Sequence, residues 1–245
     1  QQKIAELDAF GHTVAHDLKN PLTVVKISIE CLVKELRNYK DSKVVQKLTF
    51  INESTQHMVS IIESILLLAG INRTRTAQST RFSMKKSVED ALQRLKYTVE
   101  SNEVTIKKPD DWPEIYAYAP WITEVWVNYI NNAIKYGGNP EKNIKPVIEL
   151  GFDDLGSTPQ KSHQIKFWVK DNGNGIEPDE LPKLFKEFTR LHSGNTGHGL
   201  GLSIIKSIIT KSNGDVGVES EIGKGSTFYF TLPVSKAAVT HHSNH

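Results

Sequence analysis

The chain has 245 residues, a formal net charge of +2, 38% hydrophobic residues and 24% charged residues. This is the composition of a soluble globular protein, and the length suits one large domain or two ordinary ones. The net charge is too small to indicate nucleic acid or a membrane surface as a partner. The single cysteine, Cys31, excludes an internal disulfide framework and fits a reducing compartment.

The N-terminal residues already follow a helical pattern, without a signal peptide. No apolar run approaches the roughly 20 residues that a membrane-spanning helix needs. We therefore expect a fragment that lacks an upstream input module and makes no membrane contact of its own. We expect a cytoplasmic location, either as a soluble protein or as the cytoplasmic part of a membrane-anchored receptor.

Residues 1–72 predict two long helices separated by a polar break over residues 38–42. Seam residues, almost all apolar, recur at steps of three, four or seven, first at Ile4, Leu7, Val14, Leu18, Val25, Ile29, Leu32 and Leu36, and then at Val44, Leu48, Ile51, Thr55, Met58, Ile62, Ile65 and Ala69. A short connection between two such helices favours an antiparallel hairpin. One hairpin cannot bury both apolar stripes, so we expect two copies to form a homodimeric four-helix bundle. Residues 73–80 are polar and predict a linker.

Residues 81–234 mix helical and strand periodicities. Helices are predicted over 83–102, 121–136 and 202–212, and strands over 104–106, 115–118, 147–152, 164–170, 216–221 and 226–232. Gly137 and Gly138 end the second of these helices, and residues 223–225 form a hairpin turn. A mainly antiparallel sheet with helices predicts an α/β two-layer sandwich. Residues 235–245 predict a disordered tail.

A histidine on the first helix is the candidate nucleophile. His16 lies between apolar seam positions and should face solvent, where an unprotonated ring nitrogen can attack an electrophile. Asp17 can accept the proton of the other ring nitrogen, and Asn20, one turn further on, can orient a water molecule. Pro21 removes a backbone hydrogen bond beside the histidine. The alternative interpretation is an ordinary surface histidine.

The helix over 121–136 carries polar residues suited to a nucleotide. Asn128 and Asn132 lie one turn apart, so their amide oxygens can point at one Mg²⁺ ion. Lys135 can reach a phosphate, and Tyr136 can offer its ring to a base. The alternative interpretation is a polar helix face, although asparagine is a poor helix former.

Two glycine-rich segments predict the rest of the same pocket. Asp171 follows a strand and can accept a hydrogen bond from an exocyclic amine such as that of adenine, while neighbouring glycines allow close approach. Glycine amides that lead into a helix can cradle phosphate, at Gly197, Gly199 and Gly201. Neither a P-loop nor a Rossmann fingerprint is present. Residues 184–190 between the two segments predict a lid anchored by Phe185 and Phe188, which could alternatively be ordinary core residues.

The order of these segments resembles the catalytic core of sensor histidine kinases of two-component systems. AHDLKNPL is similar to the family's H box, NYINNAIKY to the N box, DNGNGI and GHGLGL to the glycine boxes, LFKEFTRL to the F box, and GKGSTFYFTLP to the closing hairpin. The resemblance covers residues 5–233. It implies a dimerisation and histidine phosphotransfer hairpin followed by a Bergerat-type ATP-binding fold.

The resemblance also implies an activity. His16 would attack the γ-phosphate of ATP and pass the phosphoryl group to an aspartate of a response regulator receiver domain. Asp17 would act as general base, and Asn20 would serve in dephosphorylation of that regulator. Asn132, with Asn128 beside it, would bind Mg²⁺. The residues predicted to bind the nucleotide are Asn128, Asn132, Lys135, Tyr136, Asp171, Gly173, Gly175, Ile176, Arg190, Gly197, Gly199, Leu200 and Gly201.

Some residues depart from the family pattern, and two other interpretations stay open. Asp17 and Lys19 replace a more usual Glu and Arg with the same charges, and Asn20 replaces a commoner Thr. Gly137-Gly138 stands where a hydroxyl residue often follows the tyrosine of the N box. An ATPase of the same fold would lack the hairpin and would carry a glutamate in place of Asn128. A degenerate kinase acting as a scaffold would not need intact Asn132, Asp171 and glycine segments.

Overall fold

The computed structural model describes residues 22–32, 42–73, 79–139, 142–157, 162–186 and 201–235. The chain divides into two compact units, one helical over its described residues and one built around a sheet. Several predicted residues lie outside the described ranges and stay predictions, namely His16, Asp17, Asn20, Phe188, Arg190, Gly197, Gly199 and Leu200. The predicted tail after Ser235 also lies outside them.

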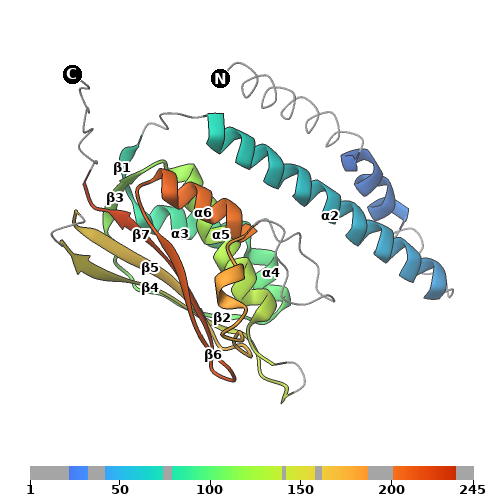
Figure 1. The fold of residues 1–245 in the computed structure, drawn as a ribbon. Helices are drawn as coiled ribbons and strands as arrows, with labels where there is room; N and C mark the ends of the chain where they lie inside the picture. Colours follow the sequence, from blue (N-terminus) through green and yellow to red (C-terminus); the bar gives the residue numbers. More distant parts are fainter. Residues whose placement is uncertain are drawn as a thin grey trace. The chain divides into compact units, whose positions relative to one another are not determined.

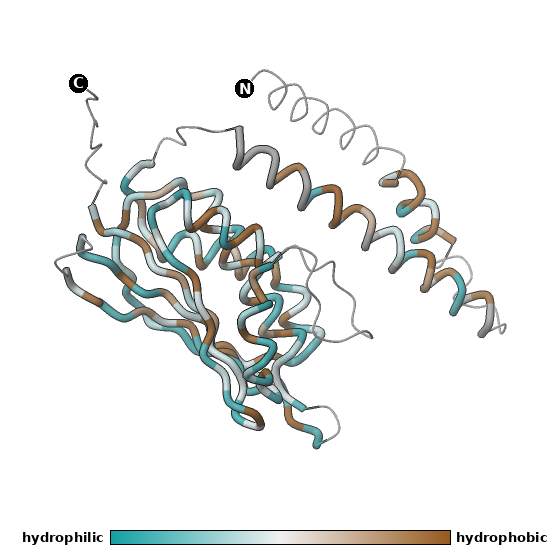
Figure 2. The backbone as a smooth tube through the Cα atoms, in the orientation of Figure 1, coloured by the Kyte–Doolittle hydropathy of each residue, from teal (hydrophilic) through white to brown (hydrophobic). Residues whose placement is uncertain are grey.

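The helical unit contains a helical segment over residues 22–32 and the long helix α2 (Ser42–Arg73) (Figure 1). The start of α2 coincides with the end of the polar break over residues 38–42. The predicted second helix is therefore confirmed. Figure 2 shows apolar and polar residues alternating along α2, as expected for a helix with one face packed and another exposed.

Burial along α2 separates the predicted seam into two stripes. Thr55 and Ile62 are 1% and 8% exposed, whereas Val44, Ile51 and Met58 are 41%, 45% and 43% exposed. The members of each stripe lie seven residues apart. The segment over 22–32 repeats this arrangement, because Ile29 is buried while the residues at 25 and 32 are exposed. One chain therefore leaves a second apolar stripe on α2 without cover, as a bundle of two hairpins requires.

The other unit is built on a five-stranded sheet with the strand order β2-β4-β5-β7-β6. These strands are β2 (Thr105–Lys107), β4 (Val147–Gly156), β5 (Gln164–Asp171), β7 (Gly225–Pro233) and β6 (Val216–Glu221). Among these five described strands only β2 and β4 pair in parallel, so the predicted, mainly antiparallel sheet is confirmed. A small second sheet pairs β1 (Thr80–Ser83) with β3 (Glu114–Ala117). The predicted hairpin turn contains Gly223 and Gly225 at φ values of 79° and 97°.

Helices cover one face of this sheet. They are α3 (Met84–Arg94), α4 (Lys96–Ser101), α5 (Ala119–Tyr136) and α6 (Gly201–Lys211), and a 3₁₀ turn, η3, spans Leu181–Lys183. The helix α5 packs on β4 and β5, and α3 packs on α5. Figure 1 shows this helix layer beside the sheet, so the predicted α/β two-layer sandwich is confirmed.

An aromatic cluster fixes α5 on the sheet. The Trp126 side chain is completely buried, and its ring meets those of Phe230 and Phe167 edge-on, with centroids 5.5 and 6.4 Å away. Its indole N–H donates to the sulfur of Met84 on α3 at 3.0 Å. Because one face of α5 is anchored in this way, the half-exposed Asn128 and Asn132 have fixed positions beside the core.

Two details of the predicted elements are wrong. The helix predicted over 83–102 is divided at Leu95, whose φ and ψ of −94° and 4° leave the helical region. Apolar spacing could not reveal this break, because the step of four from Ala91 to Leu95 to Val99 continues across it. The strand β1 was not predicted at all. Its largely polar sequence TRFS gives no strand pattern, and it forms a strand because it pairs with β3. The predicted domain boundaries stay predictions.

Candidate functional site

The carboxylate of Asp171 is placed by the alternation of β5. Ile165, Phe167 and Val169 face the helix layer and are buried, and Asp171 is the next residue in the same alternation. Its side chain is only 6% exposed. Oδ1 accepts hydrogen bonds from the backbone N–H groups of Gly173 at 2.8 Å and Ser226 at 3.2 Å. Oδ2 receives no hydrogen bond from the described residues, so it is available to a ligand.

Burial sets the protonation behaviour of this carboxyl group. Removal from water raises the pKa of Asp171, and this effect outweighs the two backbone hydrogen bonds from Gly173 and Ser226, which lower it. A donor that approached Oδ2 would stabilise the ionised form. The carboxylate is therefore suited to recognise an N–H group in a largely dry site.

Glycine is required in the turn that follows Asp171. A Cβ atom at Gly173 would overlap the carbonyl oxygen of Tyr136, the last residue of α5. Gly175 has a φ of 75°, and a Cβ atom there would overlap the carbonyl oxygen of Glu221. The backbone N–H of Ile176 donates to Oγ of Ser220 at 2.9 Å. The turn over residues 171–176 is thus pressed between the end of α5 and the β6–β7 hairpin.

The two predicted metal-binding asparagines lie on the half-exposed side of α5. The Asn128 amide nitrogen donates to the carbonyl oxygen of Glu124 at 3.0 Å, which leaves its amide oxygen for another partner. The Asn132 side chain forms no hydrogen bond with any described residue. Amide oxygens are hard ligands of the kind that Mg²⁺ accepts when phosphates and water complete its coordination. These residues therefore fit a magnesium ion brought in with a nucleotide.

Lys135 and Tyr136 end α5 beside the turn. The ammonium nitrogen of Lys135 lies 4.9 Å from the centroid of the Tyr136 ring, a cation–π contact. The Tyr136 side chain is 47% exposed, so a ring face can still meet a base. The structure brings Tyr136, Asp171 and Gly173 together from segments far apart in the sequence. Gly201 begins α6, and the rest of its glycine segment lies outside the described residues.

Sequence reasoning missed three polar residues at this site. Ser226 is 6% exposed and donates its backbone N–H to Asp171, while its Oγ lies 2.9 Å from Oγ of Ser220. Asn172 hydrogen-bonds to the backbone at three places. Only Asn172 carried a signal, because asparagine at the end of a strand commonly bonds to nearby backbone groups.

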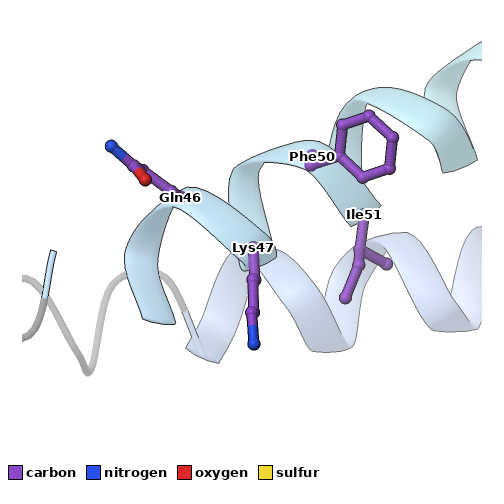
Figure 3. A pocket seen from close by; sticks show the side chains of 4 residues that line it. All are labelled: Gln46, Lys47, Phe50 and Ile51. Carbon is purple, nitrogen blue, oxygen red and sulfur yellow. The ribbon is translucent and has the colours of Figure 1, made fainter. Parts of the chain in front are cut away.

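A hollow of about 390 Å³ lies elsewhere, on α2 of the helical unit. Gln46, Lys47, Phe50 and Ile51 line it, and Figure 3 shows these side chains on successive turns of the helix. None of the predicted nucleotide-binding residues that the structure describes lines this hollow. Its wall includes Ile51 of the exposed apolar stripe, so it belongs to the surface that a second helix pair would cover.

Comparison with known protein families defines the class of the sheet unit. Residues 117–236 match the model of the histidine kinase-, DNA gyrase B- and HSP90-like ATPases. This match contains α5, the Asp171 turn and the β6–β7 hairpin, which are the parts described above. The unit is therefore an ATP-binding domain of that class.

A second match separates this chain from the other ATPases of the class. Residues 6–73 match the His Kinase A phospho-acceptor domain. The order of the two domains is that of a protein-histidine kinase, and the chain belongs to the sensor histidine kinase family as its catalytic core. The resemblance stated from the sequence motifs is confirmed.

Individual relatives agree with this family. The methanogenesis regulatory histidine kinase FilI of Methanothrix harundinacea is 29% identical over 95% of the chain, and cyanobacterial phytochrome B of Nostoc sp. strain PCC 7120 is 34% identical over 93%. The chain spans only 25% and 29% of the lengths of these two proteins. The solved structure of full-length ShkA in complex with AMPPNP shares the fold, with a TM-score of 0.66 at 22% identity, over 94% of this chain and 46% of that one. Among the described residues, no helix is both long and apolar enough to cross a membrane.

Proposed function

We propose that this chain uses Mg²⁺-ATP to phosphorylate His16 and then passes the phosphoryl group to an aspartate of a response regulator receiver domain. The Asp171 carboxylate carries the nucleotide part of the proposal. It is buried, and its Oδ1 accepts hydrogen bonds from two backbone N–H groups. Its Oδ2 is left for a donor such as the adenine amino group. The adjoining end of α5 supplies the remaining groups.

Each described residue has a distinct task in this proposal. Asp171 accepts from the adenine amine, and Tyr136 offers its ring to the base. Asn132 would bind the Mg²⁺ ion that neutralises the phosphate oxygens, with the amide oxygen of Asn128, one helical turn away, as a second ligand. Lys135 approaches a phosphate. Gly197, Gly199 and Gly201 cradle the phosphates, with Arg190 and Leu200 in the segment that covers them.

The proposed reaction is an in-line displacement at phosphorus. A neutral ring nitrogen of His16 forms a bond to the γ-phosphorus while the bond to the oxygen of the β-phosphate breaks and ADP leaves. Asp17 takes the proton that the imidazole loses. The resulting phosphoramidate then transfers the phosphoryl group to the regulator's carboxylate. In dephosphorylation of the response regulator, Asn20 would orient the water molecule that hydrolyses the phosphorylated aspartate.

Labelling with γ-³²P-ATP tests the central reaction. We expect a label on the chain that is lost in acid and retained in alkali, as a phosphohistidine would be. The label should be absent from His16→Gln and retained in His12→Gln, a matched histidine on the same predicted helix. Free phosphate without labelled protein would instead favour an ATPase, and neither product would favour a scaffold.

We further propose that the chain acts as a homodimer through the exposed stripe of α2. Val44, Ile51 and Met58 lie on one helix face, seven residues apart, and each is more than two-fifths exposed in the single chain. A second hairpin that covered this stripe would form the four-helix bundle. Burying several such side chains contributes about 1.5–3 kcal/mol each relative to exposure.

Replacing Ile51 with glutamate is expected to weaken this dimer at least about tenfold, because a charge would have to enter an apolar seam. Sedimentation equilibrium over a range of concentrations measures the change. Tyr97→Glu is the matched control, since Tyr97 on α4 is 80% exposed and should leave dimerisation unchanged. Equal dimer affinity in Ile51→Glu and the wild type would contradict the assignment of this stripe.

A further inference from the structure

Asn172 lies between Asp171, the proposed adenine ligand, and Gly173, which contacts the end of α5. Its side-chain oxygen accepts hydrogen bonds from the backbone N–H groups of Gly138 and Val147, both at 2.9 Å. Its amide nitrogen donates to the carbonyl oxygen of Lys145 at 3.1 Å. A single side chain therefore satisfies three backbone groups in a segment that begins immediately after α5.

These bonds extend the sheet past the end of β5. The β4–β5 pairing ends with Ile148 opposite Asp171, and Val147 would be the next residue to be paired. The Asn172 side chain accepts from the Val147 N–H in place of a backbone carbonyl. The backbone is thereby free to turn toward α5 at Gly173, where its path brings it against the carbonyl oxygen of Tyr136.

The other acceptor bond reaches the end of α5. Gly138 follows the helix cap at Gly137 and has a φ of 67°, a conformation that glycine adopts without strain. By holding the Gly138 N–H, Asn172 ties the Asp171 turn to the helix that carries Asn132. Asn132, on the proposed phosphate side, belongs to α5, and Asp171, on the proposed adenine side, belongs to the turn. The distance between these two side chains therefore depends on this connection.

We infer that Asn172 is a positioning residue that sets the Asp171 carboxylate relative to α5 and so determines adenine recognition. The inference rests on the proposed ATP site. Asn172 directs its own polar atoms at backbone groups and acts on the nucleotide through Asp171. Its loss should therefore alter base recognition and leave phosphoryl transfer from bound ATP intact.

The test compares Asn172→Ala with the wild type in the full chain, using calorimetric titration with Mg²⁺-ATP and Mg²⁺-GTP. We expect ATP affinity to fall about tenfold with little change for GTP, because the misplaced carboxylate weakens only the adenine contact. The labelling rate at saturating ATP should change less than about twofold, since groups on α5 remain in place. An unchanged ratio of ATP to GTP affinity would overturn the inference.

A matched asparagine in the same turn serves as the control. The Asn174 side chain accepts one hydrogen bond, from the Asn139 amide at 2.9 Å, and is exposed. Asn174→Ala should keep the wild-type ratio of affinities. Asp171→Asn distinguishes the two proposals: if it leaves ATP affinity unchanged, the adenine site itself is wrong, whereas a loss there with no loss in Asn172→Ala overturns only the positioning role.

Hydrogen exchange in the wild type decides the matter if Asn172→Ala does not fold. Ligand binding and local stability are thermodynamically coupled. If nucleotide binding depends on the hydrogen bonds to Asn172, bound nucleotide must make the opening of those hydrogen bonds less frequent. We expect Mg²⁺-ATP to increase protection of the Gly138 and Val147 amides at least about threefold, with a smaller increase for GTP. Equal protection of these amides with and without ATP would overturn the inference.

Discussion

Asp171→Asn is expected to lower the affinity for ATP about a hundredfold, through loss of a charge-assisted hydrogen bond. The asparagine oxygen can still accept from Gly173 and Ser226, as Oδ1 of Asp171 does. An NH₂ group then replaces Oδ2 and faces the adenine amine. Both groups are hydrogen-bond donors, so no hydrogen bond forms between them. Calorimetric titration measures the loss, and the labelling assay should fall with it at subsaturating ATP.

The same substitution should not destabilise the fold. Burial raises the pKa of Asp171 in the folded state. The stability linked to this shift is therefore present below the pKa of the unfolded chain and is lost as the pH rises through the folded pKa. Asparagine cannot ionise, so we expect Asp171→Asn to be at least as stable as the wild type at neutral pH.

Thermal unfolding across the pH range separates these effects. The stability of the wild type relative to Asp171→Asn should fall as the pH rises above the ordinary aspartate range and then level off. A variant that loses ATP binding and also unfolds at a much lower temperature would show that Asp171 is structural. That result would contradict its assignment to the nucleotide.

Asn132→Ala is expected to lower the labelling rate about a hundredfold, since a metal ligand that orients the phosphates is removed. The Asn132 amide has no hydrogen-bond partner among the described residues, so its removal leaves no protein group unsatisfied. The fold and the proposed dimer should remain intact, because the change lies on the half-exposed side of α5. Circular dichroism and sedimentation check both points.

Dependence on Mg²⁺ distinguishes metal coordination by Asn132 from a direct contact between Asn132 and ATP. With Mg²⁺ present, Asn132→Ala should bind ATP more weakly than the wild type, and in excess chelator the two should bind equally. Asn128→Ala tests the second proposed ligand in the same way, although it also removes the hydrogen bond from the Asn128 amide nitrogen to the Glu124 carbonyl oxygen. A defect in Asn132→Ala that persists at full size in chelator would exclude the metal-binding role.

Much of the fold follows from local sequence patterns. The steps of three, four and seven residues predicted α2, and strand periodicity predicted β5, because these periods are set by helix and strand geometry. The spacing of Asn128 and Asn132 predicted that both lie on one side of α5. The assignment of His16 as the phospho-acceptor also came from a sequence motif, and it stays a prediction because His16 lies outside the described residues.

The tertiary structure decided what no local pattern contains. The break at Leu95 lies within continuous apolar spacing, and β1 forms only because β3 pairs with it. The amide of Ser226 reaches Asp171 from a strand 55 residues further along the chain. Asn172 likewise ties the turn to the end of α5 through Gly138.

The amino-acid sequence by itself determined which chemical groups this protein has and their local spacing, from the inward-facing acid at the end of β5 to the asparagines of α5. Tertiary packing decided which of those groups meet. Contacts between Asp171 and Ser226, or between Gly173 and Tyr136, depend on strand register and on a helix anchored by Trp126. These are long-range properties, because they arise only when segments distant in the chain bury a common core.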